Sequence, residues 1–370
     1  MNFEYYMPTK VVMGRDCVKK QAGLLAPLGR HALIVTGRSA EENGALDDVL
    51  FALGANGQQA TVFCRVTPNP GIPCIREGIA LLKSAGADFV VAIGGGSPMD
   101  AAKAIALLSV QERTDEHIFD GGYAPEALPM AHIPTTAGTG SEVTPYSVLT
   151  NDVRQTKTSL SSPALFPRVA FLDGKYMARL SPEISLNTAL DALSHAMESM
   201  LSRSATPLSD TLSEEAIGLI VPLLCKAQNG SMTLEERDTM LYASTLAGMA
   251  IAQSGTTAVH GMGYALTYFH NIPHGRANAL LLGETLRLCE EKKVRALPRI
   301  LAACRMTLDG VTFLLDSLVG KREEIGKEEL EAFAVQAAQN KNIQKSVYEP
   351  TPDEVRRIYL RSFGCDAGEA

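Results

Sequence analysis

The chain has 370 residues, of which 46% are hydrophobic and 20% charged, and its formal net charge is −7. This length exceeds one small core and suits two domains. Lys and Arg are scattered in an acidic chain, so the composition argues against a nucleic-acid-binding protein. The seven cysteines form no Cys-x-x-Cys pair, and the first residues hold no apolar run of signal-peptide length. We therefore expect reduced thiols and a cytoplasmic protein.

Apolar runs and helical patterns alternate through the first half of the chain. Short apolar runs that stop at glycine or polar residues predict strands, and the stretches between them predict helices. Such alternation is typical of a parallel sheet with helices on its faces. The expected strands lie at 31–37, 59–66, 88–96, 131–136 and 169–173, and the expected helices near 40–54 and 72–86.

Residues 92–108, AIGGGSPMDAAKAIALL, read as a strand, a glycine turn and a helix. Ser97 is placed to cap this helix, and Asp100 falls where a capping-box acid would. A helix N-terminus after the glycines 94–96 offers free N–H groups to a pyrophosphate. The stretch is neither G-x-G-x-x-G nor a P-loop. It predicts a nucleotide-phosphate site, with a well-capped structural turn as the alternative.

Residues 134–144, PTTAGTGSEVT, form a second loop rich in glycine and hydroxyl groups. Thr135, Thr136 and Thr139 would offer hydroxyl groups to a cofactor. By composition alone this segment is equally compatible with an ordinary polar loop.

The pattern changes near residue 181, where Ser181 is placed to cap a helix and Pro182 suits its first position. From there the sequence is helical, with no convincing strand. We expect an α/β domain at 1–180 and a helical domain at 181–370.

Residues 239–275 contain no Asp, Glu, Lys or Arg, which raises the question of a membrane span. Ser, Thr, Gln, Gly and His interrupt the stretch too often for a lipid-facing helix. We expect buried helices here and no membrane association.

Asp191 and His195 are four residues apart and would share one face of a helix. His260, His270 and His274 follow within the uncharged stretch. One carboxylate and three imidazoles suit Fe²⁺ or Zn²⁺, and a cation would compensate the buried charge of Asp191. Chemistry alone leaves His270 and His274 open as the last ligand. His132, inside an expected strand, reads as a hydrogen-bonded core residue.

In its motifs the chain resembles the iron-containing (group III) alcohol dehydrogenase family over essentially its whole length. The resemblance implies a dinucleotide-binding α/β domain with a parallel sheet and an all-helical second domain, the dehydroquinate synthase-like architecture. It also implies a cleft with one divalent metal, and NAD(P)-linked interconversion of small alcohols with aldehydes or ketones. The matching motifs are TPNP (67–70), GGGSPMDAAKA (94–104), PTTAGTGSEVT (134–144), DALSHAMES (191–199) and HGMGYALTYFHNIPHGRANALLL (260–282).

The resemblance assigns roles to individual residues. It implies that the metal ligands are Asp191, His195, His260 and His274, which favours His274 over His270. The residues it places at the cofactor, together with Asp100 of the glycine turn, are Asn69, Gly95, Gly96, Ser97, Thr135, Thr136, Thr139 and Lys157.

Three positions depart from the family pattern. Tyr264 stands where many relatives have a further histidine implicated in substrate or proton handling. We therefore expect the proton to come from water or from a nearby side chain, with Tyr264 and His270 as the candidates. Gly283 and Gly174 each replace a usual proline. None of these changes removes a metal ligand.

The segment VTGRSAEE (35–42) bears on the choice of cofactor. Gly37 stands where NAD-preferring members of the family often have Asp, and Arg38 and Ser39 add a cation and a hydroxyl donor. Arg accommodates the 2′-phosphate of NADP(H), so we expect NADP(H) over NAD(H). Glu41 and Glu42 would oppose this preference if they faced the same site.

The sequence is also compatible with three other functions. They are a metal-free maleylacetate reductase-like enzyme, a zinc glycerol dehydrogenase-like enzyme, and a nucleotide-binding protein without turnover. Relatives are commonly dimers or larger, and residues 5–14 would supply an edge strand for pairing between two copies. We expect a homodimer or a higher homo-oligomer.

Overall fold

The structure is a computed structural model that describes residues 2–37 and 39–365. The chain divides into two compact units, a sheet unit and a helical unit. The sheet unit comprises Tyr6–Leu180 and Met232–Thr245, and the helical unit comprises Met1–Tyr5, Ser181–Ser231 and Leu246–Ala370.

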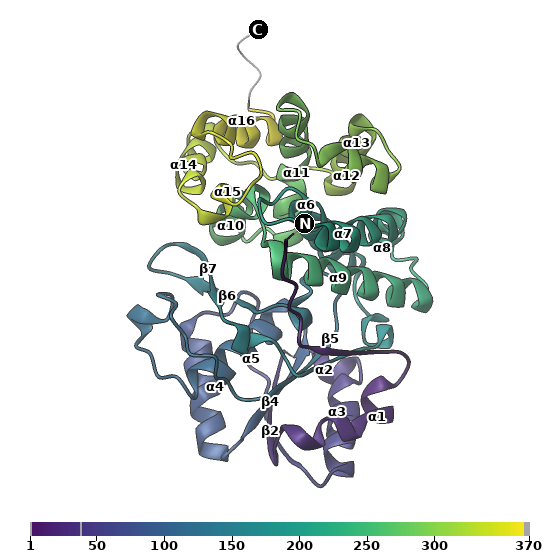
Figure 1. Cartoon of the computed structure of the whole chain (residues 1–370), viewed down its shortest axis with the longest axis vertical. Coiled ribbons are helices and arrows are strands. Elements are labelled where there is room, and N and C mark those ends of the chain that lie inside the picture. The colour runs from purple at the N-terminus through teal and green to yellow at the C-terminus, as the bar shows by residue number, and fades with distance from the viewer. Residues whose placement is uncertain (1, 38, 366–370) are drawn as a thin grey trace. The chain divides into compact units, whose positions relative to one another are not determined.

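The sheet unit contains a six-stranded parallel sheet in the order β1-β8-β5-β4-β2-β3. Its strands β2, β4 and β5 are labelled in Figure 1. Its central strands are continuous runs of buried apolar residues, as expected when helices cover both faces. The predicted parallel sheet is confirmed. The strands are β1 (Lys10–Met13), β2 (His31–Thr36), β3 (Gln59–Phe63), β4 (Phe89–Gly94), β5 (Met130–Pro134) and β8 (Val169–Leu172).

Alternate residues of each central strand serve two separate cores. Leu33 and Val90 belong to the core on the side of α4 and α5, whereas Ile34 and Val91 belong to the core on the side of α1 and α3. This alternation is the two-residue period of a strand, applied to a sheet that is buried on both faces. The helices of this unit are α1 (Cys17–Lys20), α2 (Ser39–Glu42), α3 (Ala45–Ala55), α4 (Ile72–Ala85) and α5 (Gly96–Leu108).

An antiparallel hairpin, β6 (Tyr146–Asn151) and β7 (Thr156–Ser161), was not expected from the sequence (Figure 1). Strand β6 packs on α5, and Thr150 bridges to Gly71. The two strands of the hairpin are mostly half-buried and rich in Ser and Thr, so they lack an apolar run.

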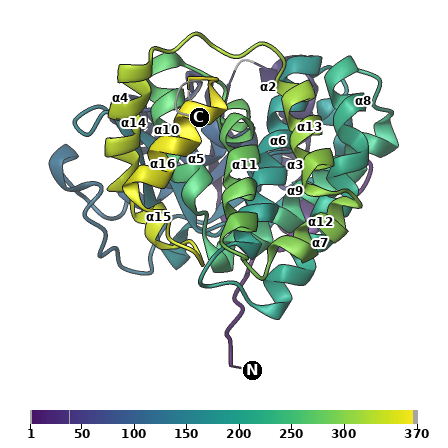
Figure 2. The same cartoon turned by 90° about the horizontal axis from the view of Figure 1, so that it is seen from above.

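The helical unit is built around α6 (Pro182–Met200), which is buried on all sides from Ala189 onward. Ser181 accepts a hydrogen bond from the Ile184 N–H and Pro182 occupies the first turn, so the predicted helix start is confirmed. Figure 2 shows α11 in the middle of this unit. The remaining helices are α7 (Pro207–Ile220), α8 (Leu224–Asn229), α9 (Leu234–Ser254), α10 (Ala258–His270), α11 (His274–Glu291), α12 (Leu297–Cys304), α13 (Leu308–Val319), α14 (Lys327–Ala338), α15 (Lys341–Gln344) and α16 (Pro352–Ser362).

The first part of α9 belongs to the sheet unit through a set of polar contacts. Asp238 accepts hydrogen bonds from Arg15 Nη2 at 2.8 Å and from the Gly174 N–H at 2.9 Å. The second bond explains the missing proline at position 174, because proline has no N–H to donate. A Cβ at Gly174 would also lie 2.3 Å from Asp238 Oδ1.

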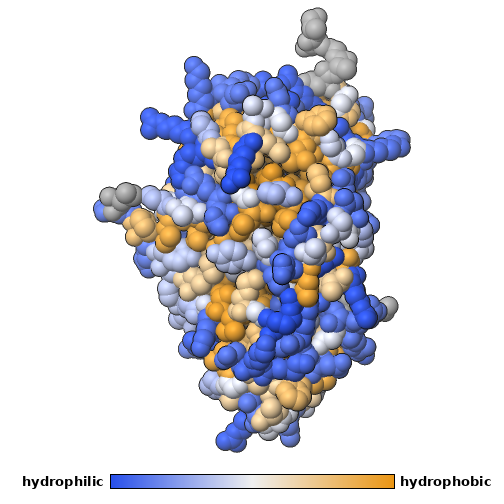
Figure 3. Space-filling view, turned by 90° about the vertical axis from the view of Figure 1, so that its right-hand side faces the viewer, coloured by the Kyte–Doolittle hydropathy of each residue, from blue (hydrophilic) through white to orange (hydrophobic). Residues whose placement is uncertain are grey.

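The uncharged stretch 239–275 forms most of α9 and all of α10, as buried helices. Among the described residues, no helix combines the length and apolarity that a bilayer crossing requires. On the face shown in Figure 3, hydrophobic areas are interspersed with hydrophilic ones.

Candidate metal centre and cofactor loops

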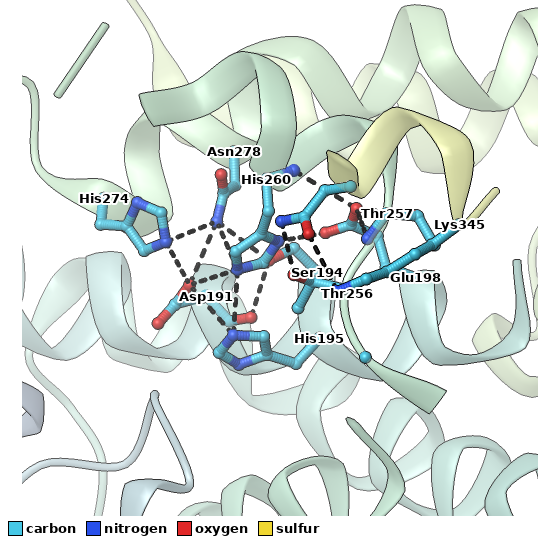
Figure 4. Close-up of polar contacts among 12 residues, drawn as sticks. Asp191, Ser194, His195, Glu198, Thr256, Thr257, His260, His274, Asn278 and Lys345 are labelled. Atoms are coloured by element: carbon cyan, nitrogen blue, oxygen red, sulfur yellow. Dashed lines mark hydrogen bonds and ion pairs between the residues drawn. The ribbon is translucent and has the colours of Figure 1, made fainter. Parts of the chain in front are cut away.

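Asp191 and His195 lie one turn apart on the buried α6, with only 4% and 6% of their surfaces exposed. His260 lies in the first turn of α10, and His274 is the first residue of α11. The side chains from these three helices point toward one another (Figure 4). The helical unit therefore brings together all four residues that the resemblance implies as ligands.

The atoms expected to bind the metal converge on one carboxylate oxygen. Asp191 Oδ1 lies 3.9 Å from His195 Nε2, 3.7 Å from His260 Nε2 and 3.8 Å from His274 Nε2. The Nε2 atoms of His195 and His260 are 3.0 Å apart. The donor atoms of Asp191, His195 and His260 form a compact buried group, all within 4.8 Å of one another.

These separations fit a divalent ion. A tetrahedral ion with bonds of about 2.0–2.1 Å has ligand atoms about 3.3 Å apart. Three imidazole nitrogens around one carboxylate oxygen are also ligands that Fe²⁺ and Zn²⁺ both accept. The residues present therefore fit the metal that the resemblance implies.

His274 reaches this group because α11 begins very close to α6. A Cβ at Gly275 would lie 1.8 Å from the carbonyl oxygen of Asn187 and 2.8 Å from the Asp191 nitrogen. Glycine at position 275 is thus a packing requirement of the centre.

Two polar residues beside the ligands were missed in the sequence. Asn278, fully buried, donates from Nδ2 to Asp191 Oδ1 at 3.1 Å. Glu198, also fully buried, contacts His260 Nδ1 through Oε2. Their spacing was a usable signal, because Asn278 is four residues after His274 and Glu198 is three after His195.

The two candidates for proton transfer lie in different places. The Tyr264 ring stacks on His274, with centroids 5.7 Å apart and planes at 14°. His270 ends α10, and its Nε2 lies 2.9 Å from Glu329 Oε1 while its ring contacts Phe333. Of the two, Tyr264 lies against a ligand side chain.

The glycine turn is built differently from the prediction. Helix α5 begins at Gly96 with Gly95 as its N-cap, and no side chain caps it, so the prediction that Ser97 caps this helix is wrong. The predicted capping-box role of Asp100 is also wrong. Asp100 instead accepts from Ser141 Oγ at 2.8 Å and from the Val148 N–H at 3.2 Å. Burial raises the pKa of Asp100 to about 6, although the nearby Lys103 opposes the shift.

The glycines allow close approach of the threonine loop. A Cβ at Gly95 would lie 2.8 Å from Thr136 Oγ1, and one at Gly96 would lie 2.6 Å from Thr139 Cγ2. Ser97 Oγ in turn accepts from the Asn69 N–H at 3.1 Å. These expected cofactor residues are thus brought together in one place.

The other expected cofactor residues lie at the ends of two strands of the six-stranded sheet and on the hairpin. Thr135 follows β5, buried, with its N–H donating to the Gly94 carbonyl at 2.9 Å. Lys157 lies on β7, opposite Thr150. Gly37 follows β2, whereas Arg38 lies outside the described residues and only the backbone of Ser39 is described, in α2.

Lys103 on α5 is a buried cation that the sequence reading overlooked. Its Nζ donates toward the carbonyl oxygens of Ser141, Thr144 and Tyr146 at 2.6–2.8 Å. Burial lowers the pKa of Lys103 to about 8, with Asp100 opposing the shift. This side chain ties the end of the threonine loop to the helix that follows the glycine turn.

Comparison with known families matches residues 8–174 to the iron-containing alcohol dehydrogenases and residues 185–363 to the C-terminal part of the same family. The chain belongs to the iron-containing alcohol dehydrogenase family. The candidate metal-centre residues and both candidate cofactor loops fall inside the matched segments.

Individual relatives agree with this assignment. Lactaldehyde reductase of Escherichia coli K12 is 36% identical over 70% of this chain and 68% of its own length. NADPH-dependent butanol dehydrogenase of Clostridium saccharobutylicum is 31% identical over 88% and 84%. The crystal structure of an iron-containing alcohol dehydrogenase from Thermotoga maritima superposes with a TM-score of 0.92, at 37% identity, covering 98% of this chain and all of the other. As a member of this family, the chain is an oxidoreductase of alcohols and aldehydes.

Proposed function

We propose that this chain reduces a small aldehyde to the alcohol, reversibly, with NADPH as preferred cofactor and one Fe²⁺ or Zn²⁺ ion. Asp191, His195, His260 and His274 would hold the ion. The observation that carries the proposal is the convergence of three imidazole nitrogens on Asp191 Oδ1 at 3.7–3.9 Å.

The chemistry divides between the bound groups and the protein. When bound, the cation supplies Lewis-acid polarisation of a carbonyl group, and the reduced nicotinamide supplies the hydride. The protein orients the three imidazoles and the carboxylate from rigid, buried helices. Tyr264 presents a phenol next to His274 and is our candidate for the residue that hands a proton to the product oxygen.

The preference for NADPH rests on the end of β2. Gly37 leaves no negative charge there to repel a 2′-phosphate, and Arg38 follows directly in the sequence. The name of the Clostridium relative shows that NADPH dependence occurs in the family.

We also propose a cytoplasmic homodimer. All seven cysteines are free, which suits a reducing compartment. Strand β1 lies at the end of the sheet and pairs there with β8, so its outer side is an edge that a second copy would cover.

The test combines metal analysis with turnover. Purified protein should carry a divalent ion and oxidise NADPH when given members of an aldehyde panel. His195→Ala should lose the ion and the activity together. Full activity in the variant after chelation would contradict the assigned site, and a wild-type enzyme active without any metal would favour the maleylacetate reductase-like alternative.

A further inference from the structure

Glu198 lies on the same face of α6 as two of the expected metal ligands. It follows His195 by three residues and Asp191 by seven, so the three side chains are stacked along consecutive helical turns. Its side chain is completely buried. A buried carboxylate is costly unless it is fully hydrogen-bonded, so its contacts indicate why it is there.

The two oxygens of Glu198 have different partners (Figure 4). Oε1 accepts three hydrogen bonds, from the Thr257 N–H at 2.9 Å, from Thr257 Oγ1 at 2.8 Å and from the His260 N–H at 3.3 Å. Oε2 contacts His260 Nδ1. One oxygen therefore caps the start of α10, and the other holds an imidazole of that helix.

The contact at Oε2 decides where His260 carries its proton. A carboxylate oxygen only accepts, so Nδ1 must donate to it. In the neutral ring the other nitrogen, Nε2, then presents its lone pair. That nitrogen is the one that lies 3.0 Å from His195 Nε2 and 3.7 Å from Asp191 Oδ1.

We propose that Glu198 is a positioning residue that fixes His260 as the Nδ1–H tautomer and holds Nε2 ready for a divalent cation. This inference rests on the metal site of the proposed function. Carboxylates that hold a ligating histidine in this way raise metal affinity without touching the metal.

The variant Glu198→Gln tests the role sharply because it keeps the shape of the side chain. Three donors surround Oε1, so the amide oxygen of Gln would take that side. The amide N–H₂ group would then face His260 Nδ1 and donate to it. His260 would have to accept at Nδ1 and carry its proton on Nε2, which blocks the ligating nitrogen. The helix cap at Thr257 would be retained.

Zn²⁺ affinity is measured by competition with a chromophoric chelator, and the ligand field by the visible spectrum of the Co²⁺-loaded protein. We expect Glu198→Gln to bind Zn²⁺ about 10- to 100-fold more weakly than wild type, with an altered Co²⁺ spectrum. The matched control is Glu142→Gln, since Glu142 is equally buried but belongs to the sheet unit. It should keep the wild-type affinity and spectrum.

Two outcomes are distinguishable. If wild type binds neither ion, the metal site of the proposed function fails and the role of Glu198 fails with it. If wild type binds and Glu198→Gln shows the same affinity and spectrum, only the role of Glu198 is overturned.

A second measurement does not depend on the variant folding. Long-range ¹H–¹⁵N spectra of the metal-free wild type, labelled at histidine, report which nitrogen of His260 is protonated. The signals of His260 are identified because they are lost in His260→Asn. We expect these signals to show the Nδ1–H tautomer. An Nε2–H tautomer would overturn the proposal.

Discussion

Tyr264 lies one helical turn after His260, and its ring stacks on His274 at a centroid distance of 5.7 Å. If its hydroxyl group transfers the proton, Tyr264→Phe should lower kcat about 100-fold, the lower end of the range for a general acid, and leave the metal content unchanged. Phenylalanine would keep the ring that stacks on His274. An unchanged metal content would therefore show that the packing at His274 is intact. Tyr268→Phe, one turn further along α10, is the control and should keep the wild-type rate. An unchanged rate and pH profile in Tyr264→Phe would clear this residue of a proton role.

The proposed preference for NADPH rests on Gly37 at the end of β2. Among the described residues, a Cβ there would meet only the Val66 carbonyl oxygen, at 3.6 Å, so the Cβ of an aspartate fits without displacing that oxygen. Gly37→Asp should lower kcat/KM for NADPH relative to NADH by about tenfold or more, because the new carboxylate repels the 2′-phosphate and can hold a ribose hydroxyl. The measurement is the ratio of kcat/KM for the two cofactors. Wild-type preference for NADH, or an unchanged ratio in the variant, would contradict the assignment.

At the residue scale the sequence indicated the candidate ligands better than the residues that support them. Asp191 and His195 are visible because their spacing is helical and their chemistry suits a metal. Glu198 and Lys103 are equally buried, yet charged residues are ordinarily exposed. The spacing of Glu198 from His195 was its one local signal, and nothing local marks Lys103. Their partners lie 59 residues away for Glu198 and Thr257, and 38 for Lys103 and Ser141. Only the tertiary fold brings such partners together.

Helix α5 and the threonine loop are held together by Lys103. Lys103→Met would leave the carbonyl groups of Ser141, Thr144 and Tyr146 and the carboxylate of Asp100 without their cation. We expect a loss of about 3–5 kcal/mol in the free energy of unfolding, the usual cost of breaking a buried charged network. Denaturant titration measures this loss. Lys83→Met, which removes an exposed pair with Glu112, should stay within about 0.5 kcal/mol of wild type. Equal losses in both variants would show that Lys103 has no special structural role.

The elements that the sequence predicted well are those with strong periodicity. The central strands and the start of α6 follow from apolar runs and from the Ser181 cap. The hairpin β6–β7 escaped because its Ser and Thr residues resemble a loop. The start of α5 was misplaced because Gly95 offers a backbone cap without a side chain, whereas the prediction looked for a hydroxyl group.

The whole molecule should lose stability in acid partly because of one histidine. His132 on β5 is fully buried, and neither ring nitrogen has a hydrogen-bond partner, so the expectation of a hydrogen-bonded core residue was wrong. Burial, followed by the charge of Lys103, holds the pKa of His132 well below 6.5. The unfolded chain binds a proton there below about pH 6.5 and the native chain does not, so the free energy of unfolding falls as the pH drops, by up to about 1.4 kcal/mol per pH unit.

His132→Leu should remove this contribution. We expect its free energy of unfolding to fall less steeply than that of wild type between about pH 6.5 and 5, because leucine cannot take up a proton. Urea titrations at several pH values give both curves. Parallel curves would mean that His132 is protonated in the native state as readily as in the unfolded one.

Assembly is also a property of the whole molecule. If β1 pairs across a two-fold axis, sedimentation should show a dimer of the 39.6 kDa chain. The Lys10 and Gly14 N–H groups donate toward β8, so the N–H of Val11, which alternates with them, faces the outer edge. Val11→Pro would remove this donor and should shift the protein toward monomer. A wild-type monomer at micromolar concentration would contradict the proposal.

The contribution of Met232–Thr245 to the sheet unit has a consequence for synthesis on the ribosome. The strands are complete once residue 180 has emerged, but Asp238 and Thr245, the partners of Gly174 and Glu142, arrive up to 65 residues later. At about 5–20 residues per second this is a delay of about 3–13 s. During that time Glu142 lacks the hydroxyl group that it binds in the finished protein. The nascent sheet unit must therefore wait for part of the helical unit to be made, and a fragment ending at residue 180 would lack these contacts.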